Sequence, residues 1–496
     1  MERHDSASKR DNEGPSEHRN EAAAPRQDGT GPFVAVTALF FFWGFITVMN
    51  DVVIPFLKSS FDLSYFQSGL VQFAFFGAFF VISLIYFAFS VGGGDPINRV
   101  GYQRTIVAAL VICAAGCGLF APAAASESYA FFLGALFLLA TGVTLLQIAA
   151  NPYAAILGRP ENASARLNFA QGLNSLGTTL APVAGGLLLY EVFARGGEVT
   201  LDAIRIPYLI YGGMFLALAV VMAFVHLPRI NPQRSVAVDG AGSALGFPQL
   251  RLGMVAIFMY VGGEVAIGSY LVSFMGDPAV MGWSEGIASL YLAFYWGGAM
   301  IGRLCGAIAM AHTSQPARKP VLILVTAAVL LGIIYVVTAL RFEDGQLQAR
   351  FLPIVELWPF VLMIALCLGA FAIARGKPPA VLALFSMVLC VLLVLAVFST
   401  GRVAMWVALG TGLFNSIMWS NIFTLAIDDL GEHTSQGSSL LVMMIVGGAL
   451  LPLLMGAVGD AVGIRSAFLT VVPCYLYIAY YGWWSHRRVA AAGGST

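Results

Sequence analysis

Two acidic side chains lie within long apolar stretches of the sequence, where an ionised carboxylate is energetically unfavourable. Asp51 lies in the stretch 33–57, and Glu264 lies near the middle of the stretch 251–275. A charge at the centre of a lipid bilayer costs at least ~2.5–3.5 kcal/mol, whereas a sheltered carboxyl can hold a proton and release it when water or a cation arrives. We therefore predict that Asp51 and Glu264 hold a coupling cation. The alternative is a permanently protonated acid that makes one hydrogen bond between helices.

Neutral amides at helical spacing occupy two other apolar stretches. Gln147 and Asn151 lie four residues apart, which places them on one helix face, and Asn168, Gln171 and Asn174 form a second amide stripe. Carboxamides donate and accept hydrogen bonds without carrying a charge, which suits a ligand whose hydroxyls also do both. Hydrogen bonding between helices is the structural alternative for such residues.

An aromatic side chain and an amide share the stretch 403–427. Asn415 and Trp419 lie four residues apart there. An indole face against the C–H face of a sugar ring, beside an amide for its hydroxyls, is typical of a hexose subsite. Packing or lipid contact is the alternative for Trp419. The candidate substrate-binding residues are Asn50, Gln147, Asn151, Gln171, Asn174, Asn415 and Trp419.

The composition excludes several classes of protein. Of 496 residues, 59% are hydrophobic and only 10% are charged, against ~25% charged residues in an average soluble domain. The 26 Lys and Arg balance the 26 Asp and Glu, so no basic field favours nucleic acid. The six cysteines lie in apolar stretches without a CxxC pair or a nearby His, so we predict no metal site and no cofactor other than a coupling ion, H⁺ or Na⁺.

The chain contains fourteen apolar stretches long enough to cross a bilayer, which predicts an all-α polytopic membrane protein. Lys and Arg are more frequent in the connections on the side of the N-terminus, which predicts that both termini lie in the cytoplasm. The charged, Pro- and Gly-bearing residues 1–32 are expected to be a disordered cytoplasmic tail, and residues 485–496 a second one. The predicted spans are 33–57, 66–90, 103–124, 129–157, 166–193, 207–227, 251–275, 286–310, 320–340, 357–375, 380–398, 403–427, 437–458 and 465–484.

A faint internal repeat indicates a duplicated chain. The sequence FAFF at 73–76 resembles LAFY at 292–295, and Asn151 and Pro182 are spaced as Asn421 and Pro452 are. The shift from Asn151 to Asn421 exceeds the shift from residue 73 to residue 292 by the length of two helices. We therefore predict an N-terminal six-helix bundle at 33–227, a cytoplasmic linker at 228–250, and a C-terminal bundle at 251–484 with two inserted helices at about 320–375.

The loop after the second span carries a recognisable signature. The sequence GDPINRVGYQR at 94–104 resembles the G-x-x-x-D-R-x-G-R-R pattern between helices two and three of the major facilitator superfamily, with Asn98 where Asp is usual. Such a loop can tie helix ends together and control their rocking; an ordinary basic inner loop is the alternative. The candidate gating residues are Gly94, Asn98, Arg99, Gly101 and Arg104.

Further segments resemble the fucose:proton symporter family of the major facilitator superfamily, and within it the glucose/galactose transporter branch. They are FFFWG at 40–44 followed by MND at 49–51, LQIAANPY at 146–153, RLNFAQGLNS at 166–175, and FNSI at 414–417 with IFTLAI at 422–427. The resemblance covers roughly 33–310 and 380–484. It implies the major facilitator fold with twelve shared helices, alternating access, sugar uptake driven by a cation, and an essential intramembrane acid at Asp51.

Three departures from that family bear on function. Fucose transporters carry Glu where this chain has Gln147, whereas the glucose/galactose branch has Gln there and an acid at the position of Glu264. This leaves the coupling ion open between a proton and sodium. Trp419-Ser420-Asn421 stands where the family usually reads F-P-T, so the choice of substrate can differ. The two inserted helices have no counterpart in the usual members.

The sequence thus predicts a cation-coupled symporter that imports a monosaccharide, such as glucose, galactose, fucose or N-acetylglucosamine, as a monomer in a bacterial inner membrane. The alternative is a drug/proton antiporter, because GTTLAPVAGG at 177–186 approaches the G-P-x-x-G-G pattern of such proteins. A sugar sensor that moves nothing is a further alternative. An enzyme is not expected, since neither HExxH nor GxSxG occurs.

Overall fold

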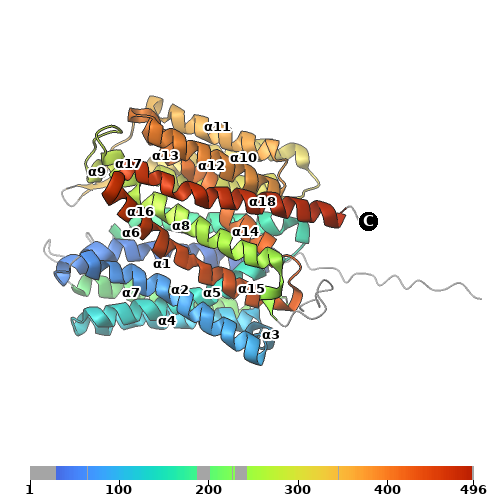
Figure 1. Ribbon diagram of the computed structural model, residues 1–496. Helices are drawn as coiled ribbons and strands as arrows, with labels where there is room; N and C mark the ends of the chain where they lie inside the picture. Colours follow the sequence, from blue (N-terminus) through green and yellow to red (C-terminus); the bar gives the residue numbers. More distant parts are fainter. Residues whose placement is uncertain are drawn as a thin grey trace, which may run out of the picture.

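The computed structural model describes residues 30–63, 65–186, 201–225, 227–228, 243–343 and 346–493. The expected N-terminal tail therefore lies outside the described residues up to position 29. The described chain consists of helices and one short hairpin, and the long helices run side by side in two groups (Figure 1). The first half of the chain forms the blue to teal group, and most of the second half lies across from it.

The first half contains the helices that pack around α4 and α5. Within it, α4 packs against α5 and α7, α1 packs against α6, and α2 packs against α5. Its elements are α1 Thr30–Ser60, α2 Tyr65–Gly93, α3 Pro96–Val100, α4 Tyr102–Ala125, α5 Tyr129–Ile156, η1 Pro160–Asn162, α6 Ala163–Gly186 and α7 Leu201–Phe224.

The second half begins after the connection between the two groups and contains more elements. Its antiparallel hairpin pairs Leu340 with Ala349 and Glu343 with Gln346. Its elements are η3 Ala244–Gly246, α8 Pro248–Gly276, α9 Glu285–Met310, η4 Pro316–Arg318, α10 Lys319–Ala339, β1 Leu340–Glu343, β2 Gln346–Ala349, η5 Ile354–Leu357, α11 Trp358–Ile373, α12 Pro378–Phe398, α13 Gly401–Asn415, α14 Met418–Ile427, η6 Gly431–His433, α15 Thr434–Met443, η7 Met444–Val446, α16 Gly447–Val462, α17 Ile464–Ala467, η8 Phe468–Val471 and α18 Val472–Gly493.

The second half repeats the packing of the first. In it α12 packs against α13 and α18, as α4 does against α5 and α7, and α8 packs against α16, as α1 does against α6. The helices α10 and α11 stand outside this repeat and pack against α9 and α13. The predicted fold, two six-helix bundles with a two-helix insertion in the C-terminal half, is therefore confirmed.

Fourteen helical spans are present if polar helices are counted. Twelve described segments are long and apolar enough to cross a membrane, and α6 and α18 occupy the other two positions that the sequence predicts. Amides such as Asn168, Gln171 and Asn174 lower the hydropathy of α6, which is why it does not stand out as an apolar segment. The helix α18 continues to Gly493, so most of the expected C-terminal tail is helical.

Two stretches predicted as continuous spans are broken in the middle. The stretch 403–427 divides into α13 and α14, because α13 ends at Asn415 and α14 begins at Met418. The stretch 437–458 divides into α15 and α16, with the 3₁₀ turn η7 at Met444–Val446 between them. Asn415 and Trp419 therefore do not share one continuous helix face, contrary to the sequence-based expectation. Broken helices leave backbone and side-chain groups available beside a binding site.

One end of the two bundles carries the connection between the halves, and we call it the linker face. The loops 94–101, 157–162, 311–318 and 428–433 lie there, at the right in Figure 1 beside α3, α15 and the end of α18. The predicted linker 228–250 lies partly outside the described residues, and its last residues already belong to η3 and α8.

Candidate functional site: a central cavity between the two bundles

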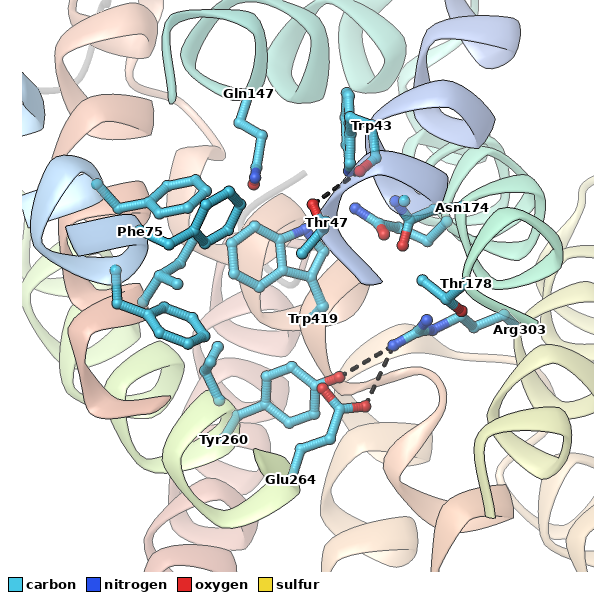
Figure 2. A pocket seen from close by; sticks show the side chains of 16 residues that line it. Trp43, Thr47, Phe75, Gln147, Asn174, Thr178, Tyr260, Glu264, Arg303 and Trp419 are labelled. Atoms are coloured by element: carbon cyan, nitrogen blue, oxygen red, sulfur yellow. Dashed lines mark hydrogen bonds and ion pairs between the residues drawn. The ribbon is translucent and has the colours of Figure 1, made fainter. Parts of the chain in front are cut away.

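A cavity of about 160 Å³ lies between the two bundles. Its lining comes from α1, α2, α5 and α6 of the first bundle and from α8, α9, α14 and η7 of the second. The polar lining residues are Thr47, Gln147, Gln171, Asn174, Thr178, Tyr260, Glu264 and Arg303, and the aromatic ones besides Tyr260 are Trp43, Phe75, Phe76, Phe79 and Trp419. Sequence-predicted residues from four helices thus meet at one place (Figure 2).

Hydrogen bonds hold the predicted amides in the cavity wall. Asn151 on α5 donates from Nδ2 to the carbonyl of Gln147 at 3.0 Å, and its Oδ1 accepts from Gln171 Nε2 on α6 at 3.3 Å. Asn151 itself is fully buried behind Gln171. Asn174 donates to the carbonyl of Phe40 on α1 at 2.9 Å. Gly44 permits this close approach of α1 and α6, since a Cβ at Gly44 would collide with Asn174.

An ion pair forms the opposite wall of the cavity. Arg303 Nη2 on α9 lies 3.2 Å from Glu264 Oε1 on α8, and both side chains are about nine-tenths buried. The same Nη2 donates to Tyr260 Oη at 3.2 Å, and Arg303 Nε donates to the carbonyl of Ser416 at 3.0 Å, in the break between α13 and α14. Arg303 Nη1 donates to the hydroxyl of Ser175, which belongs to α6 of the first bundle. Arg303 therefore links both bundles beside the cavity, and Figure 2 shows its bonds to Tyr260 and Glu264.

Arg303 is the main residue that the sequence-based prediction missed. It lies two turns before the end of α9 and is 8% exposed. The usable signal was its position within an apolar stretch, because an Arg there needs an acidic partner as much as Glu264 needs a basic one. Trp43, Thr47 and Tyr260 were also not anticipated as lining residues.

Aromatic rings supply the apolar part of the lining. Figure 2 shows the indole of Trp419 in the middle of the lining side chains, between Gln147 and Tyr260. Trp419 is 6% exposed, and its Nε1 donor has no hydrogen-bond partner. The hydroxyl of Thr47 donates to the carbonyl of Trp43 at 2.7 Å, so its oxygen can accept a hydrogen bond from a ligand.

Besides Asn151, which lies behind Gln171, three predicted residues do not line the cavity or have side chains that are not described. Asn415 is buried behind Tyr295: its Nδ2 donates to Tyr295 Oη at 3.0 Å, and Tyr295 donates to the backbone carbonyl of Glu264 at 2.9 Å. Asn415 thus supports α8 at Glu264 and does not reach the cavity. The backbone of Asn50 and Asp51 belongs to α1, but their side chains lie outside the described part of the chain.

The predicted gating loop contacts the second bundle at the linker face. Gly94 and Gly101 adopt positive φ of 83° and 93°, which fits their place in the signature. Asp95 caps α3 by accepting from Ile97 N at 2.9 Å, and it also accepts from the hydroxyl of Tyr86 at 2.6 Å. Burial raises the pKa of the Asp95 carboxyl above its ordinary value.

Two of the three polar side chains in the gating set have hydrogen-bond partners. Asn98 donates to the carbonyl of Glu432 in the second bundle at 2.8 Å, whereas Arg99 donates to the carbonyl of Gly93 within its own loop. Arg104 is exposed. The contact between bundles thus comes from Asn98, the residue that departs from the usual signature.

Further hydrogen bonds join the bundles between the cavity and the linker face. Tyr102 and Ser435 lie 3.1 Å apart at their hydroxyls, and Ser438 donates to the carbonyl of Ile148 at 3.0 Å. Gln436 Nε2 donates to the hydroxyl of Ser90 on α2 at 3.0 Å. The two bundles therefore contact each other closely on the linker side of the cavity.

The cysteines take no part in this site. All six cysteines are free and buried. Among the residues that the structure describes, no group of three or more His, Cys, Asp or Glu side chains could hold a metal ion.

The chain resembles known membrane transporters in sequence and in fold. The family model of the Major Facilitator Superfamily matches residues 33–374. The glucose/galactose transporter of Brucella abortus is 43% identical, over 90% of this chain and 92% of that protein. The L-fucose-proton symporter of Escherichia coli is 28% identical, over 90% and 91%. A crystal structure of the transporter FucP in the outward conformation superposes with a TM-score of 0.70 at 25% identity, and covers 92% of this chain and 99% of that one.

Proposed function

Because this chain belongs to the major facilitator superfamily, we propose that it is a symporter that imports a monosaccharide together with a cation by alternating access. Its relatives are named as transporters, and the chain is a transporter rather than an enzyme. One observation carries the proposal of a sugar substrate: amides, hydroxyls and aromatic rings from both bundles surround a single central cavity of about 160 Å³.

The chemistry of the lining suits a neutral polyol. Gln147, Gln171 and Asn174 offer donors and acceptors to hydroxyl groups, and the indole of Trp419 offers a flat apolar surface to the C–H face of a ring. The cavity has the volume of about five waters at ~30 Å³ each. A single sugar ring fits that scale. Candidate substrates are glucose, galactose, fucose and N-acetylglucosamine.

Coupling needs a group whose charge changes when the cation binds. Asp51 is our candidate for the primary cation site, and Glu264 is the candidate for the second. A proton or Na⁺ at Glu264 would compete with Arg303, which lies 3.2 Å away. Since Arg303 also bonds Ser175 on α6, a change of charge at Glu264 would alter a contact between the bundles. This arrangement gives a physical route from cation binding to bundle movement.

The linker face is cytoplasmic in this proposal, and the protein acts as a monomer in a bacterial inner membrane. The excess of Lys and Arg on the side of the N-terminus supports this orientation. With the bundles in contact on the linker side, the structure corresponds to the half of the cycle in which sugar enters from the opposite face. Import is completed when these contacts open.

Transport by the purified protein in proteoliposomes tests the proposal. We expect one or more labelled monosaccharides to accumulate when either a pH gradient or a Na⁺ gradient is imposed separately, and the effective gradient identifies the ion. Asp51→Asn should abolish accumulation and keep counterflow, since exchange needs no net cation movement. Accumulation by Asp51→Asn would contradict the role of Asp51. Absence of counterflow with every sugar, together with efflux of cationic dyes, would favour the antiporter alternative.

A further inference from the structure

A column of buried polar side chains leads from the cavity toward the linker face. Ser164 and Asn168 follow Gln171 on one face of α6, at successive turns away from the cavity. Asn421 and Thr424 follow Trp419 along α14 in the same direction. The column therefore begins at two cavity-lining residues and runs along the interface between α6 and α14, which pack against each other.

The polar groups of the column meet across the two bundles. Asn168 Nδ2 donates to Asn421 Oδ1 at 3.1 Å, and the hydroxyls of Ser164 and Thr424 lie 2.7 Å apart. Asn168 and Asn421 are fully buried, and Ser164 and Thr424 are more than nine-tenths buried. These neutral pairs lie between the cavity and the linker face, and both join α6 of the first bundle to α14 of the second.

The column also contains buried polar atoms that this closed arrangement leaves without a partner. They are Oδ1 of Asn168, Nδ2 of Asn421 and Oγ of Ser420, and all three side chains are fully buried. Buried polar atoms without partners are rare, because each loses its hydrogen bonds to water on burial. Apolar side chains would close the same path without this loss. These unpaired donors and acceptors therefore indicate another state of the protein, in which a ligand forms hydrogen bonds with them.

We propose that Asn168, Ser420 and Asn421 form a second binding station, which holds a neutral polyhydroxylated ligand, the transported sugar, on its way from the cavity to the linker face. This inference rests on the proposed function. In the closed state Asn168 Nδ2 donates both to Asn421 Oδ1 and to the carbonyl of Ser164 on its own helix at 2.8 Å, whereas Asn168 Oδ1 and Asn421 Nδ2 have no partner. When α6 and α14 separate, Asn421 Oδ1 is also released, and the two amides can donate to and accept from sugar hydroxyls.

Two substitutions at Asn421 test the station against a purely structural role. Asn421→Ala removes its donor and acceptor, whereas Asn421→Ser returns a hydroxyl. We expect Asn421→Ala to slow sugar counterflow about tenfold, the effect of about one lost hydrogen bond in the exit step. Its equilibrium affinity for sugar, read from intrinsic tryptophan fluorescence, should stay within about twofold, and Asn421→Ser should recover most of the rate.

The matched control is Ser164→Ala, which removes the neighbouring contact between the bundles and leaves both amides in place. If the amides only hold the bundles together, Asn421→Ala should behave like Ser164→Ala and exchange sugar at the unmodified rate or faster. That result would contradict the proposal that these residues form a second binding station. Counterflow absent from the unmodified chain would instead contradict the proposed function itself, so the two failures are distinguishable.

A labelling experiment decides the question if the Asn421 variants do not fold. Ser420→Cys places a thiol in the station, and the six native cysteines are buried. We expect a membrane-impermeant maleimide to reach Cys at this position only from the linker face, and sugar to slow the reaction. Ser435→Cys, at a buried position of the contact between the bundles nearer the linker face, corrects for any change in opening. Equal effects of sugar on both variants would overturn the station.

Discussion

Arg303 and Glu264 form a buried ion pair whose Nη2 and Oε1 atoms lie 3.2 Å apart in the wall of the central cavity. Each residue comes from a different helix of the second bundle, and Arg303 extends the network to Ser175 in the first. Taking two charges out of water is expensive, and the pair is tolerable because Tyr260 and Ser416 also satisfy the guanidinium. Removing one partner would leave the other charge uncompensated.

Arg303→Gln should therefore destabilise the protein strongly. We expect a loss of about 3–5 kcal/mol in the free energy of unfolding, because a buried Glu264 carboxylate loses its counter-charge. The double substitution Arg303→Gln with Glu264→Gln should lose less than the single one. The measurement is thermal unfolding of the detergent-solubilised protein, followed by intrinsic fluorescence.

Arg402 provides the control for this experiment. Its pair with Glu356 spans 3.6 Å, and the Arg402 side chain is 67% exposed. Exposed pairs contribute about 0–1 kcal/mol, so Arg402→Gln should hardly change the unfolding temperature. Equal losses of stability in Arg303→Gln and Arg402→Gln would show that the buried pair contributes no more to stability than the exposed pair does.

Trp419 should contribute to sugar affinity through both its ring and its Nε1 donor. Trp419→Phe keeps an aromatic face and removes the Nε1 donor, which has no hydrogen-bond partner within the described protein. We expect the Kd for sugar to rise about threefold to tenfold, the range of one neutral hydrogen bond. Trp419→Ala should weaken binding further, because the ring contact is also lost. Isothermal titration with the transported sugar measures both effects.

The control for Trp419 is Trp483 on α18, whose side chain is 46% exposed and far from the cavity lining. Trp483→Phe should leave the Kd unchanged within about twofold. An unchanged Kd in Trp419→Phe would mean that the indole nitrogen does not bind the sugar.

Most of the fold could be predicted from the sequence, because membrane-spanning helices are specified by apolar length. The unequal offsets of two short repeats predicted a two-helix insertion at about 320–375, and α10 and α11 occupy that part of the chain. The breaks at 416–417 and at η7 could not be predicted. Their sequence is as apolar as a continuous helix, and only the packing around the cavity distinguishes them.

The candidate site was predictable in its polar residue types and less so in its contacts. Gln147, Gln171 and Glu264 were identified because polar groups inside apolar stretches are costly, and all three line the cavity. Asn415 satisfies the same criterion, yet it binds Tyr295 behind the wall. Whether an amide faces the cavity or a neighbouring helix depends on how its helix is rotated about its own axis. The spacing of residues in one short segment does not determine that rotation. The side chain of Asp51 lies outside the described residues, so its role stays a prediction.

Gln436 should control how tightly the bundles close at the linker face. It is 3% exposed, donates to Ser90 on α2, and accepts from the backbone nitrogen of Ala244. Gln436→Ala removes the contact with Ser90, which joins the two bundles, so the equilibrium should shift toward separated bundles by about fivefold to tenfold. Spin labels at the exposed positions Arg99 and Glu432 should then report a larger population of long distances.

Thr105→Ala is the matched control, because the Thr105 hydroxyl donates to Gly101 within one bundle. It removes a hydrogen bond of the same kind and should leave the distance distribution unchanged. If Gln436→Ala also leaves that distribution unchanged, Gln436 does not contribute to closure.

Asp95 should make stability depend on pH in the acidic range. Burial raises the pKa of its carboxyl above the ordinary value of 3.8, partly offset by hydrogen bonds from Tyr86 and Ile97. The folded protein therefore holds this proton more tightly than the unfolded chain does. The resulting stabilisation is present below the unfolded pKa and is lost as the pH rises through the raised folded pKa.

Asp95→Asn isolates this effect, because an amide keeps an acceptor for Ile97 N and cannot ionise. The unfolding temperature of the unmodified protein, minus that of Asp95→Asn, should fall as the pH rises from the unfolded pKa of about 3.9 through the raised pKa of the folded protein. A difference for Asp95→Asn that rises with pH would mean that the ionised carboxylate is the form stabilised by the fold, and that its hydrogen bonds at the start of α3 outweigh the cost of burial.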